Sequence, residues 1–248
     1  MNPSTVDITF FVPCYNEAPH VASTFEMIKR LMQRRSLTYE IAAVDDGSSD
    51  GTSQVVEAYC KEHPDQPIVF HRNPVNLGLG RNYFLWAKRS RGRHYMLING
   101  DNDTSIDDFA LILDHLGKAD MIVPYVANQH DRPSHRNLIS RGFNLAVSLV
   151  SGHRLRYYNG PVLHLRENVV RFEPKASGFA YQAEILCRAL NEGCSHVEVP
   201  LYYVKKEQDS SSGFRLHNIA SVLKSLTRIF VKTLQYRLFK PALKTQSQ

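Results

Sequence analysis

The chain has 248 residues, 43% of them hydrophobic, which is enough for one large domain, or one domain with an appendage, around a substantial core. Its four cysteines show no Cys-x-x-Cys spacing and its histidines no His-x-x-x-His spacing, which argues against a zinc site and predicts reduced thiols in a cytosolic protein. No apolar run approaches the ~18 residues that span a bilayer, and the first residues lack the basic and apolar regions of a signal peptide.

Charge is unevenly distributed along the chain. The net charge is +6 at neutral pH, whereas the segment from residue 215 onwards carries seven basic residues and no acidic one, so residues 1–214 sum to −1. A basic character confined to one segment indicates a local anionic partner for that segment.

Short β-rich runs alternate with helical patterns over residues 7–126. Strands are expected at Asp7–Pro13, Tyr39–Val44, Ile68–His71, Tyr95–Ile98 and Met121–Val126, and helices at Ala18–Met32, Thr52–Cys60, Gly80 to about Lys88, and Ile106–Leu116. This alternation predicts an α/β fold with a mostly parallel sheet covered on both faces. Ligands bind such sheets beyond the carboxyl ends of the strands. Three polar clusters follow strands in this way, Tyr15-Asn16-Glu17, Asp45-Asp46 and Asp101/Asp103, and together they predict one site.

The strand at Tyr95–Ile98 is followed by two carboxylates, Asp101 and Asp103. Side chains in an extended segment alternate sides, so these two can point the same way and share one ion. Mg²⁺ binds through one or two carboxylates and completes its coordination with water and substrate phosphates. The pair therefore predicts a binding site for a complex of a metal ion and a diphosphate. The alternative is a helix N-cap, because Thr104, Ser105 and further acidic residues precede an apolar-periodic run.

The second half of the chain is less regular. Helices are expected at Asn137–Val150 and Phe179–Asn191, a strand within Cys194–Val204, a return to the edge of the sheet over Arg156–Leu165, and loops at Gln129–Arg136 and at the Ser-rich Lys205–Gly213, which is expected to be mobile. We expect a globular domain at residues 1–214 and a basic helical tail at residues 215–248.

Residues Leu216–Phe239 show the pattern of one amphipathic helix. Apolar residues recur mostly at three- and four-residue steps and are flanked by Lys224, Arg228, Lys232 and Arg237. This pattern is typical of a helix that lies in a membrane interface. The alternative is a helix packed on the domain with a solvated basic face, and a partner subunit or a partner membrane helix stays open.

Four ordered motifs resemble those of the family 2 glycosyltransferases of the GT-A fold. They are Val12-Pro13-Cys14-Tyr15-Asn16-Glu17, Asp45-Asp46-Gly47-Ser48-Ser49-Asp50-Gly51-Thr52, Leu77-Gly78-Leu79-Gly80 and Asp101-Asn102-Asp103. Later segments, Leu138–Asn144, Tyr181–Glu184 and Val197–Pro200, are most similar to dolichol-phosphate mannose synthase and related polyprenyl-phosphate sugar transferases. The resemblance covers about residues 7–215.

The resemblance implies a role for each matching residue. The residues that would hold the nucleotide are Pro13, Tyr15, Glu17, Asp45 and Asp46, with Asp45 contacting the base. Those that would flank the diphosphate are Asp101, Asn102 and Asp103, with Mg²⁺ or Mn²⁺ bound by Asp101 and more directly by Asp103. Those that would meet phosphate charge are Arg141, Lys205, Lys206 and Arg215. Asp103, Arg141 and Glu184 are the residues expected to take part in catalysis.

The resemblance implies an inverting transfer from a GDP- or UDP-linked sugar to a polyprenyl phosphate, on the cytoplasmic face of a membrane. A phosphate monoester has a second pKa near ~6, so such an acceptor needs no general base. A hydroxyl acceptor on a saccharide, lipid or small molecule does need one, and Glu184, then Asp131, is the candidate. An ion pair of Glu184 with Arg188, one helical turn on, is the structural alternative.

Two other classes of function are weighed against this one. A non-catalytic relative that binds nucleotide sugars is disfavoured by the intact acidic pair. A nucleic-acid partner is not expected, because the aromatic residues of the basic tail are not arranged as a stacking platform. The sequence leaves the oligomeric state open, including a homo-oligomer.

Three positions depart from the subgroup that the chain resembles. Ser105 stands where a Gln often provides a further metal ligand, and Pro124 precedes Tyr125 where an Arg often meets phosphate. The segment Tyr158–Val162 replaces a Ser-Gly-Phe-Arg-like stretch. These departures leave the identity of donor and acceptor open, but not the fold.

Overall fold

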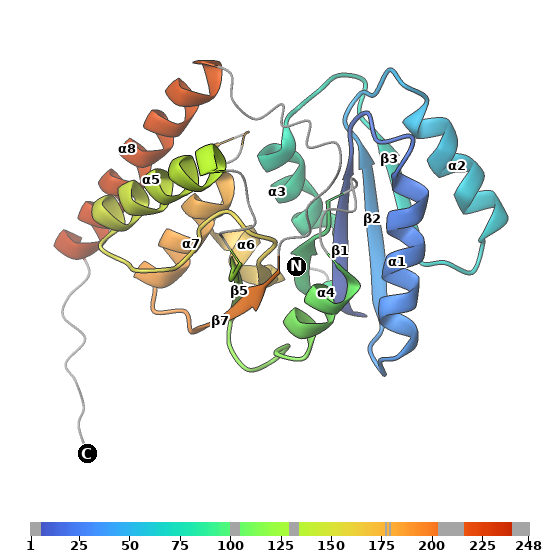
Figure 1. Cartoon of the computed structure of the whole chain (residues 1–248), viewed down its shortest axis with the longest axis horizontal. Coiled ribbons are helices and arrows are strands. Elements are labelled where there is room, and N and C mark those ends of the chain that lie inside the picture. Colours follow the sequence, from blue (N-terminus) through green and yellow to red (C-terminus); the bar gives the residue numbers. More distant parts are fainter. Residues whose placement is uncertain are drawn as a thin grey trace.

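A seven-stranded sheet organises the chain, in a computed structural model that describes residues 6–99, 105–128, 134–176, 178, 180–202 and 216–239. The strands are β1 (Val6–Cys14), β2 (Tyr39–Asp45), β3 (Ile68–Arg72), β4 (Gly92–Leu97), β5 (Met121–Val126), β6 (Leu163–Leu165) and β7 (His196–Leu201). Their order is β3-β2-β1-β4-β6-β5-β7, and every pairing is parallel except the two made by β6 (Figure 1). The predicted mostly parallel sheet is therefore confirmed.

Helices cover both faces of the sheet. They are α1 (Val21–Gln33), α2 (Thr52–Glu62), α3 (Leu79–Arg89), α4 (Ile106–Leu113), α5 (Ser134–Ser151), α6 (Arg166–Arg171), α7 (Tyr181–Asn191) and α8 (Leu216–Phe239). Alternate residues of β1 serve the two faces, since Phe10 packs among α1, α2 and α4, and Phe11 among α3, α6 and α7. Both side chains are fully buried, as expected for a central parallel strand.

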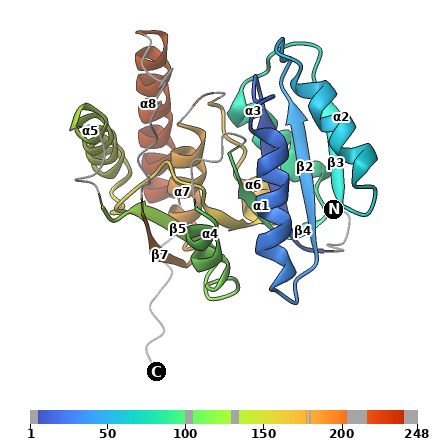
Figure 2. The ribbon, with the colours of Figure 1, turned by 45° about the vertical axis from the view of Figure 1, so that its right-hand side comes forward.

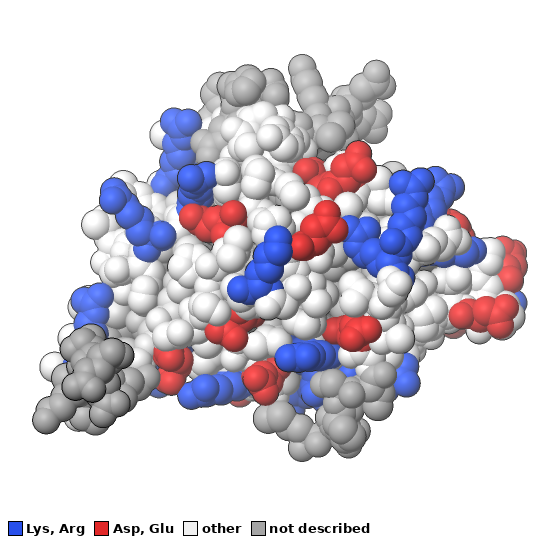
Figure 3. All heavy atoms as spheres, turned by 90° about the horizontal axis from the view of Figure 1, so that it is seen from below, with Lys and Arg blue, Asp and Glu red and all other residues white. Residues whose placement is uncertain are grey.

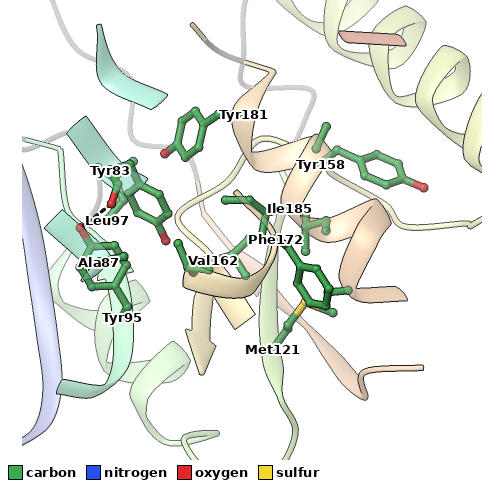
Figure 4. Packing of buried hydrophobic residues seen from close by; sticks show 14 of the residues in the cluster. Tyr83, Ala87, Tyr95, Leu97, Met121, Tyr158, Val162, Phe172, Tyr181 and Ile185 are labelled. Atoms are coloured by element: carbon green, nitrogen blue, oxygen red, sulfur yellow. Dashed lines mark hydrogen bonds between the residues drawn. The ribbon is translucent and has the colours of Figure 1, made fainter. Parts of the chain in front are cut away.

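Aromatic side chains fill the core on the α3 and α7 side. The ring of Tyr83 lies 4.8 Å from that of Tyr95 and 4.9 Å from that of Tyr181, measured between centroids (Figure 4). The Tyr95 hydroxyl donates a hydrogen bond to the backbone carbonyl of Tyr83, which satisfies this buried polar group. This packing joins α3 and α7 to β4.

Two expectations about the strands are wrong. Within Arg156–Leu165 only Leu163–Leu165 forms a strand, and it lies antiparallel in the interior of the sheet, between β4 and β5, instead of at an edge. Pro13 does not end β1, which continues to Cys14. The backbone oxygen of Phe11 accepts a hydrogen bond from the backbone N–H of Ile98, on the β4 side of β1. The nitrogen of Pro13, two residues further along, faces the same side, where β4 has already ended. Its missing N–H therefore costs no ladder bond.

Two helical features also differ from expectation. α5 begins at Ser134, inside the segment expected to be a loop, and the short helix α6 was not anticipated. The predicted bounds of α8 and β5 agree with the structure. The division at residue 215 stays a prediction, although α8 packs against α5 and α7. Among the described helices, none is long and apolar enough to cross a membrane.

Candidate functional site

The loops that follow β1 and β2 are hydrogen-bonded to each other at the carboxyl edge of the sheet. The backbone N–H of Asn16 donates to Ser48 Oγ at 2.9 Å, and that of Glu17 donates to Thr52 Oγ1 at 2.9 Å. The side-chain Oδ1 of Asn16, a residue with φ 57°, also accepts a hydrogen bond from the backbone N–H of Ser49. The expectation that these two polar clusters share one edge is confirmed.

Asp45, at the end of β2, is fully buried and oriented by two serines. Its Oδ1 accepts from the backbone N–H and the hydroxyl of Ser48 at 2.8 and 2.6 Å, and its Oδ2 accepts from the hydroxyl of Ser53. The half-exposed Arg72 places its Nε 3.9 Å from Asp45 Oδ2. This arrangement gives a buried, oriented carboxylate beside a half-exposed cation at the carboxyl edge of the sheet.

Sequence reasoning missed Arg72, because its position depends on the pairing of two strands. The register of β2 and β3 places Arg72 opposite Asp45 at the carboxyl end of both strands. The signal was present, since Arg72 and Asn73 follow the strand expected at Ile68–His71 in the same way that the other polar clusters follow theirs.

Asp46 differs from Asp45 because its carboxylate holds the chain itself. Its Oδ1 accepts from Asn73 Nδ2 and from the backbone N–H of Leu77, both at 2.8 Å, and its Oδ2 accepts from the backbone N–H of Gly78 at 2.9 Å. These three bonds tie the 73–78 loop to the end of β2. A contact of Asp46 with nucleotide stays a prediction.

The Leu77-Gly78-Leu79-Gly80 motif also has a packing reason. Gly78 has φ 86°, a conformation that glycine adopts without strain. Gly80 has no room for a Cβ, which would meet the backbone oxygen of Ala176 and the side chain of Tyr181. The two glycines therefore let α3 start close against α7.

The aromatic ring of Tyr15 is 48% exposed at the mouth of this edge, and Pro13 and Glu17 are partly buried next to it. An exposed ring beside the buried acceptor Asp45 suits stacking on a nucleobase. The roles of Pro13, Tyr15 and Glu17 in nucleotide binding stay predictions.

The acidic pair lies outside the described residues, in the 100–104 segment. β4, which leads into it, runs parallel to β1, so the end of β4 lies at the same edge as the loops of β1 and β2. Asp131, Lys205, Lys206 and Arg215 are likewise outside the described residues. Among the described residues, no group of three His, Cys, Asp or Glu side chains is arranged to hold a metal.

The chemistry around the end of β4 fits a hard cation. Asp101 and Asp103 supply carboxylate oxygens, the ligands that Mg²⁺ and Mn²⁺ prefer. Asp108, in the first turn of α4, has one oxygen bonded to the backbone N–H of Tyr202 and one buried oxygen without a partner among the described residues. Ser105 acts as the N-cap of α4, accepting from the backbone N–H of Asp108 at 3.1 Å, so the N-cap alternative is confirmed for this residue.

Glu184 is buried in α7 and paired with a cation of α8. Its Oε1 accepts a hydrogen bond from Arg228 Nε at 2.9 Å and forms an ion pair with Arg228 Nη2 at 2.8 Å, and its Oε2 accepts from the backbone N–H of Lys175 at 2.8 Å. The structural alternative, an ion pair with Arg188, names the wrong partner, because Arg188 donates instead to the backbone oxygen of Glu173. Helical spacing suggested a neighbour on the same helix, and α8 supplied the partner.

Arg141 lines a cavity of about 150 Å³ between α5 and the loop that follows it. Ser140, Asn144 and Arg156 line the same cavity, which opens beside Val126 at the carboxyl end of β5. The structure thus places the phosphate-contact candidate Arg141 at the same edge of the sheet as Asp45, on the other side of β4.

Comparisons with known proteins give a consistent picture. A family model described as "Glycosyl transferase family 2" matches residues 9–175. Dolichyl-phosphate beta-glucosyltransferase ALG5C of Trichomonas vaginalis is 27% identical over 171 residues, which are 62% of this chain and 50% of the relative. Dolichyl-phosphate beta-glucosyltransferase of Dictyostelium discoideum is 24% identical over 251 residues, 92% of this chain and 75% of the relative. The chain spans half or less of the length of the three Trichomonas relatives it matches.

A solved structure shares the fold. Glucosyl-3-phosphoglycerate synthase of Mycobacterium tuberculosis, crystallised with Mn²⁺, uridine diphosphate and phosphoglyceric acid, superposes with a TM-score of 0.63 and 18% identity. The superposition covers 96% of this chain and 80% of the other. At this identity the likeness describes the fold and not the substrates.

Proposed function

Because this chain belongs to glycosyl transferase family 2 and has the GT-A fold, we propose that it transfers a sugar from a nucleoside-diphosphate sugar to a polyprenyl phosphate. The observation that carries the proposal is the meeting of the β1 and β2 loops with Arg72 at one edge, beside the strand that leads into the acidic pair. The relatives are named as glucosyltransferases acting on dolichyl phosphate, so UDP-glucose is the first donor to test.

The reaction needs no general base from the protein. An ionised phosphate oxygen of the acceptor attacks C1 of the sugar, the bond from C1 to the diphosphate oxygen breaks with its electron pair, and the configuration inverts. Asp101 and Asp103 would hold a divalent cation, which would neutralise the charge that develops on the leaving diphosphate. Asp45 would orient the nucleotide, and Arg72 would add positive charge beside it. The engagement of Glu184 by Arg228 favours this acceptor over a hydroxyl, which requires a base.

An assay of sugar transfer into an organic phase tests the proposal. Purified chain is incubated with Mn²⁺ or Mg²⁺, a panel of labelled nucleotide sugars, and a short polyprenyl phosphate. We expect label from one donor to enter the organic phase, and the product to be β-linked if the donor is α-linked. Transfer only to hydroxyl acceptors would contradict the proposal that the acceptor is a polyprenyl phosphate. The absence of binding or turnover with every donor would contradict the proposal that the chain is an enzyme.

We also propose that α8 and α5 lie on a membrane. α8 buries a mixed strip against the domain, in which the polar Ser225 and Thr233 flank the apolar Ile229. It leaves a stripe of large apolar side chains exposed, namely Leu223, Phe230, Val231, Leu234 and Leu238. α5, which lies beside α8 (Figure 2), exposes Leu138, Leu145 and Leu149. A helix that leaves several large apolar side chains exposed while it buries only a narrow mixed strip suits an interface.

The charges on this surface support the same proposal. Neither α5 nor α8 contains an acidic residue, whereas the face seen from below mixes acidic and basic side chains (Figure 3). Cations beside an apolar stripe suit anionic lipids. All four cysteines are free thiols, which fits the cytoplasmic side of the membrane.

The double variant Phe230→Asp/Leu234→Asp is expected to bind vesicles of phosphatidylcholine and phosphatidylglycerol at least ~10-fold more weakly, because each buried large apolar side chain contributes about 2 kcal/mol. Co-sedimentation with vesicles measures this. Val69→Asp, at an exposed apolar position of β3, is the matched control and should bind as the unaltered chain does. If the unaltered chain does not bind vesicles and sediments as a dimer, the apolar stripe is an interface between two copies and the membrane proposal is wrong.

A further inference from the structure

An arginine lies against the aromatic ring of Tyr125, at the carboxyl end of β5. Arg156, from the loop between α5 and β6, lies with its guanidinium carbon 4.3 Å from the centre of the Tyr125 ring. Cation–π stacking of this kind orients a guanidinium without neutralising its charge.

The loop that carries Arg156 is fixed at both sides. The backbone N–H of Arg156 donates to Glu198 Oε1 of β7 at 2.7 Å, and its backbone oxygen accepts from Asn144 Nδ2 of α5 at 3.1 Å. The oxygen of the same Asn144 side chain accepts from the backbone N–H of Tyr158. The side chain of Arg156 is nevertheless 61% exposed, so it is positioned by its backbone and by one ring while staying accessible to a ligand.

The cavity of about 150 Å³ beside Arg156 has the composition of an anion site. Two arginines, Arg141 and Arg156, line it together with the hydroxyl of Ser140 and the amide of Asn144. Arg156 forms a long ion pair with Glu198, whose Oε2 lies 3.9 Å from Arg156 Nε. Since a guanidinium has five N–H donors, this long ion pair leaves others that can form a bidentate bond with phosphate.

The cavity is also close to the proposed donor site. β5, whose end opens onto it, is two strand positions from β4, roughly 10 Å at the usual spacing between strands. Arg141 lies on the same helix as the exposed Leu138 and Leu145. An acceptor with its phosphate in the cavity could thus rest a lipid chain on the outer face of α5.

We propose that Arg156, together with Arg141, binds the phosphate group of the acceptor, a phosphate monoester. Tyr125 is the positioning residue for Arg156. This inference rests on the proposed function for the identity of the acceptor, but not for the binding of phosphate. The monoester can belong to a prenyl phosphate or to a soluble phosphorylated molecule, and the exposed face of α5 favours the prenyl phosphate.

The test compares Arg156→Ala with Arg154→Ala, which removes the same charge from an exposed position of the same loop that does not line the cavity. In Arg156→Ala we expect KM for a short prenyl phosphate to rise about 10-fold, the scale of one charged hydrogen bond, while KM for the donor and the melting temperature stay unchanged. Arg154→Ala should leave all three unchanged. Arg156→Lys should recover part of the loss, and Tyr125→Leu should give a smaller rise than Arg156→Ala.

Direct titration separates this inference from the proposed function. A short, water-soluble prenyl phosphate and glycerol 3-phosphate are titrated calorimetrically into each variant in the absence of donor. Binding that Arg156→Ala weakens and Arg154→Ala does not would support the phosphate site even if no transfer occurs, and the tighter of the two probes identifies the source of the phosphate. Equal affinities in the unaltered chain and Arg156→Ala, or an equal loss in both variants, would overturn it.

Discussion

Replacement of Asp103 by alanine is expected to lower kcat/KM for sugar transfer about 10³-fold. Asp103 is the residue expected to ligate the divalent cation most directly, and losing charge stabilisation of about 4 kcal/mol at the leaving diphosphate corresponds to that factor. Initial rates of transfer from the active donor to polyprenyl phosphate measure the change. Asp107→Ala is the matched control, because Asp107 is an exposed carboxylate four residues further along, in the first turn of α4.

A second readout does not depend on turnover. Titration of the nucleoside diphosphate in the presence and absence of Mn²⁺ should show that the metal strengthens binding to the unaltered chain and to Asp107→Ala, but not to Asp103→Ala. If Asp103→Ala keeps normal transfer and normal metal-dependent binding, the acidic pair is not the metal seat. In that case Asp101 and Asp103 would serve only the loop before α4.

The parallel part of the fold was predictable because its signals are local. Each strand of β1 to β4 is a short apolar run followed by turn residues, and each intervening helix shows its own periodicity, so order and handedness of the layers follow from general rules. β6 was misplaced because three residues carry no periodicity. Its position between β4 and β5 is decided by pairing with residues more than 40 positions away along the chain.

The part of the candidate site that depends on local sequence signals was also predictable. Tyr15 and Asp45 could be assigned to one edge because polar residues at the carboxyl ends of parallel strands must meet there. Arg72 was missed although it follows a predicted strand, because its place opposite Asp45 depends on the register of β2 and β3. Arg156 could not be assigned, because its position depends on a loop stacked on Tyr125. The motif could not distinguish Asp45 from Asp46 either. Only the bonds of Asp46 to Leu77 and Gly78 show that it anchors a loop.

α8 shows a different limit of the sequence. Its bounds follow from periodicity, but the pattern does not decide whether the apolar stripe faces the domain or a membrane. In the structure, Leu223, Phe230 and Leu234 are exposed while Ser225 and Thr233 face the domain. The helix is held there by Arg228 on Glu184 and by a hydrogen bond from Asn191 to Thr233, neither of which helical periodicity reveals.

The pair formed by Glu184 and Arg228 supports a second large effect, this time on stability. Arg228→Ala is expected to lower the free energy of unfolding by about 2 kcal/mol, because it leaves the carboxylate of Glu184 buried and without its cation. Loss of a buried pair can cost about 3–5 kcal/mol, and the smaller figure allows for solvent at Arg228, whose side chain is 33% exposed against 2% for Glu184. Denaturant unfolding measures it. Arg188→Ala, which removes the cation first expected to pair with Glu184, should cost less.

The same pair separates a structural from a catalytic carboxylate. If Glu184 only holds α8, then Glu184→Gln and Arg228→Ala should both destabilise the chain, and kcat for transfer to polyprenyl phosphate should change less than threefold in each. The losses should be strongly non-additive, because the double variant Glu184→Leu/Arg228→Leu buries no unpaired charge. If instead Glu184 is a general base, Glu184→Gln should lower kcat by about 10²-fold or more while Arg228→Ala does not. That result would require an acceptor with a proton to lose, and so a hydroxyl in place of a phosphate.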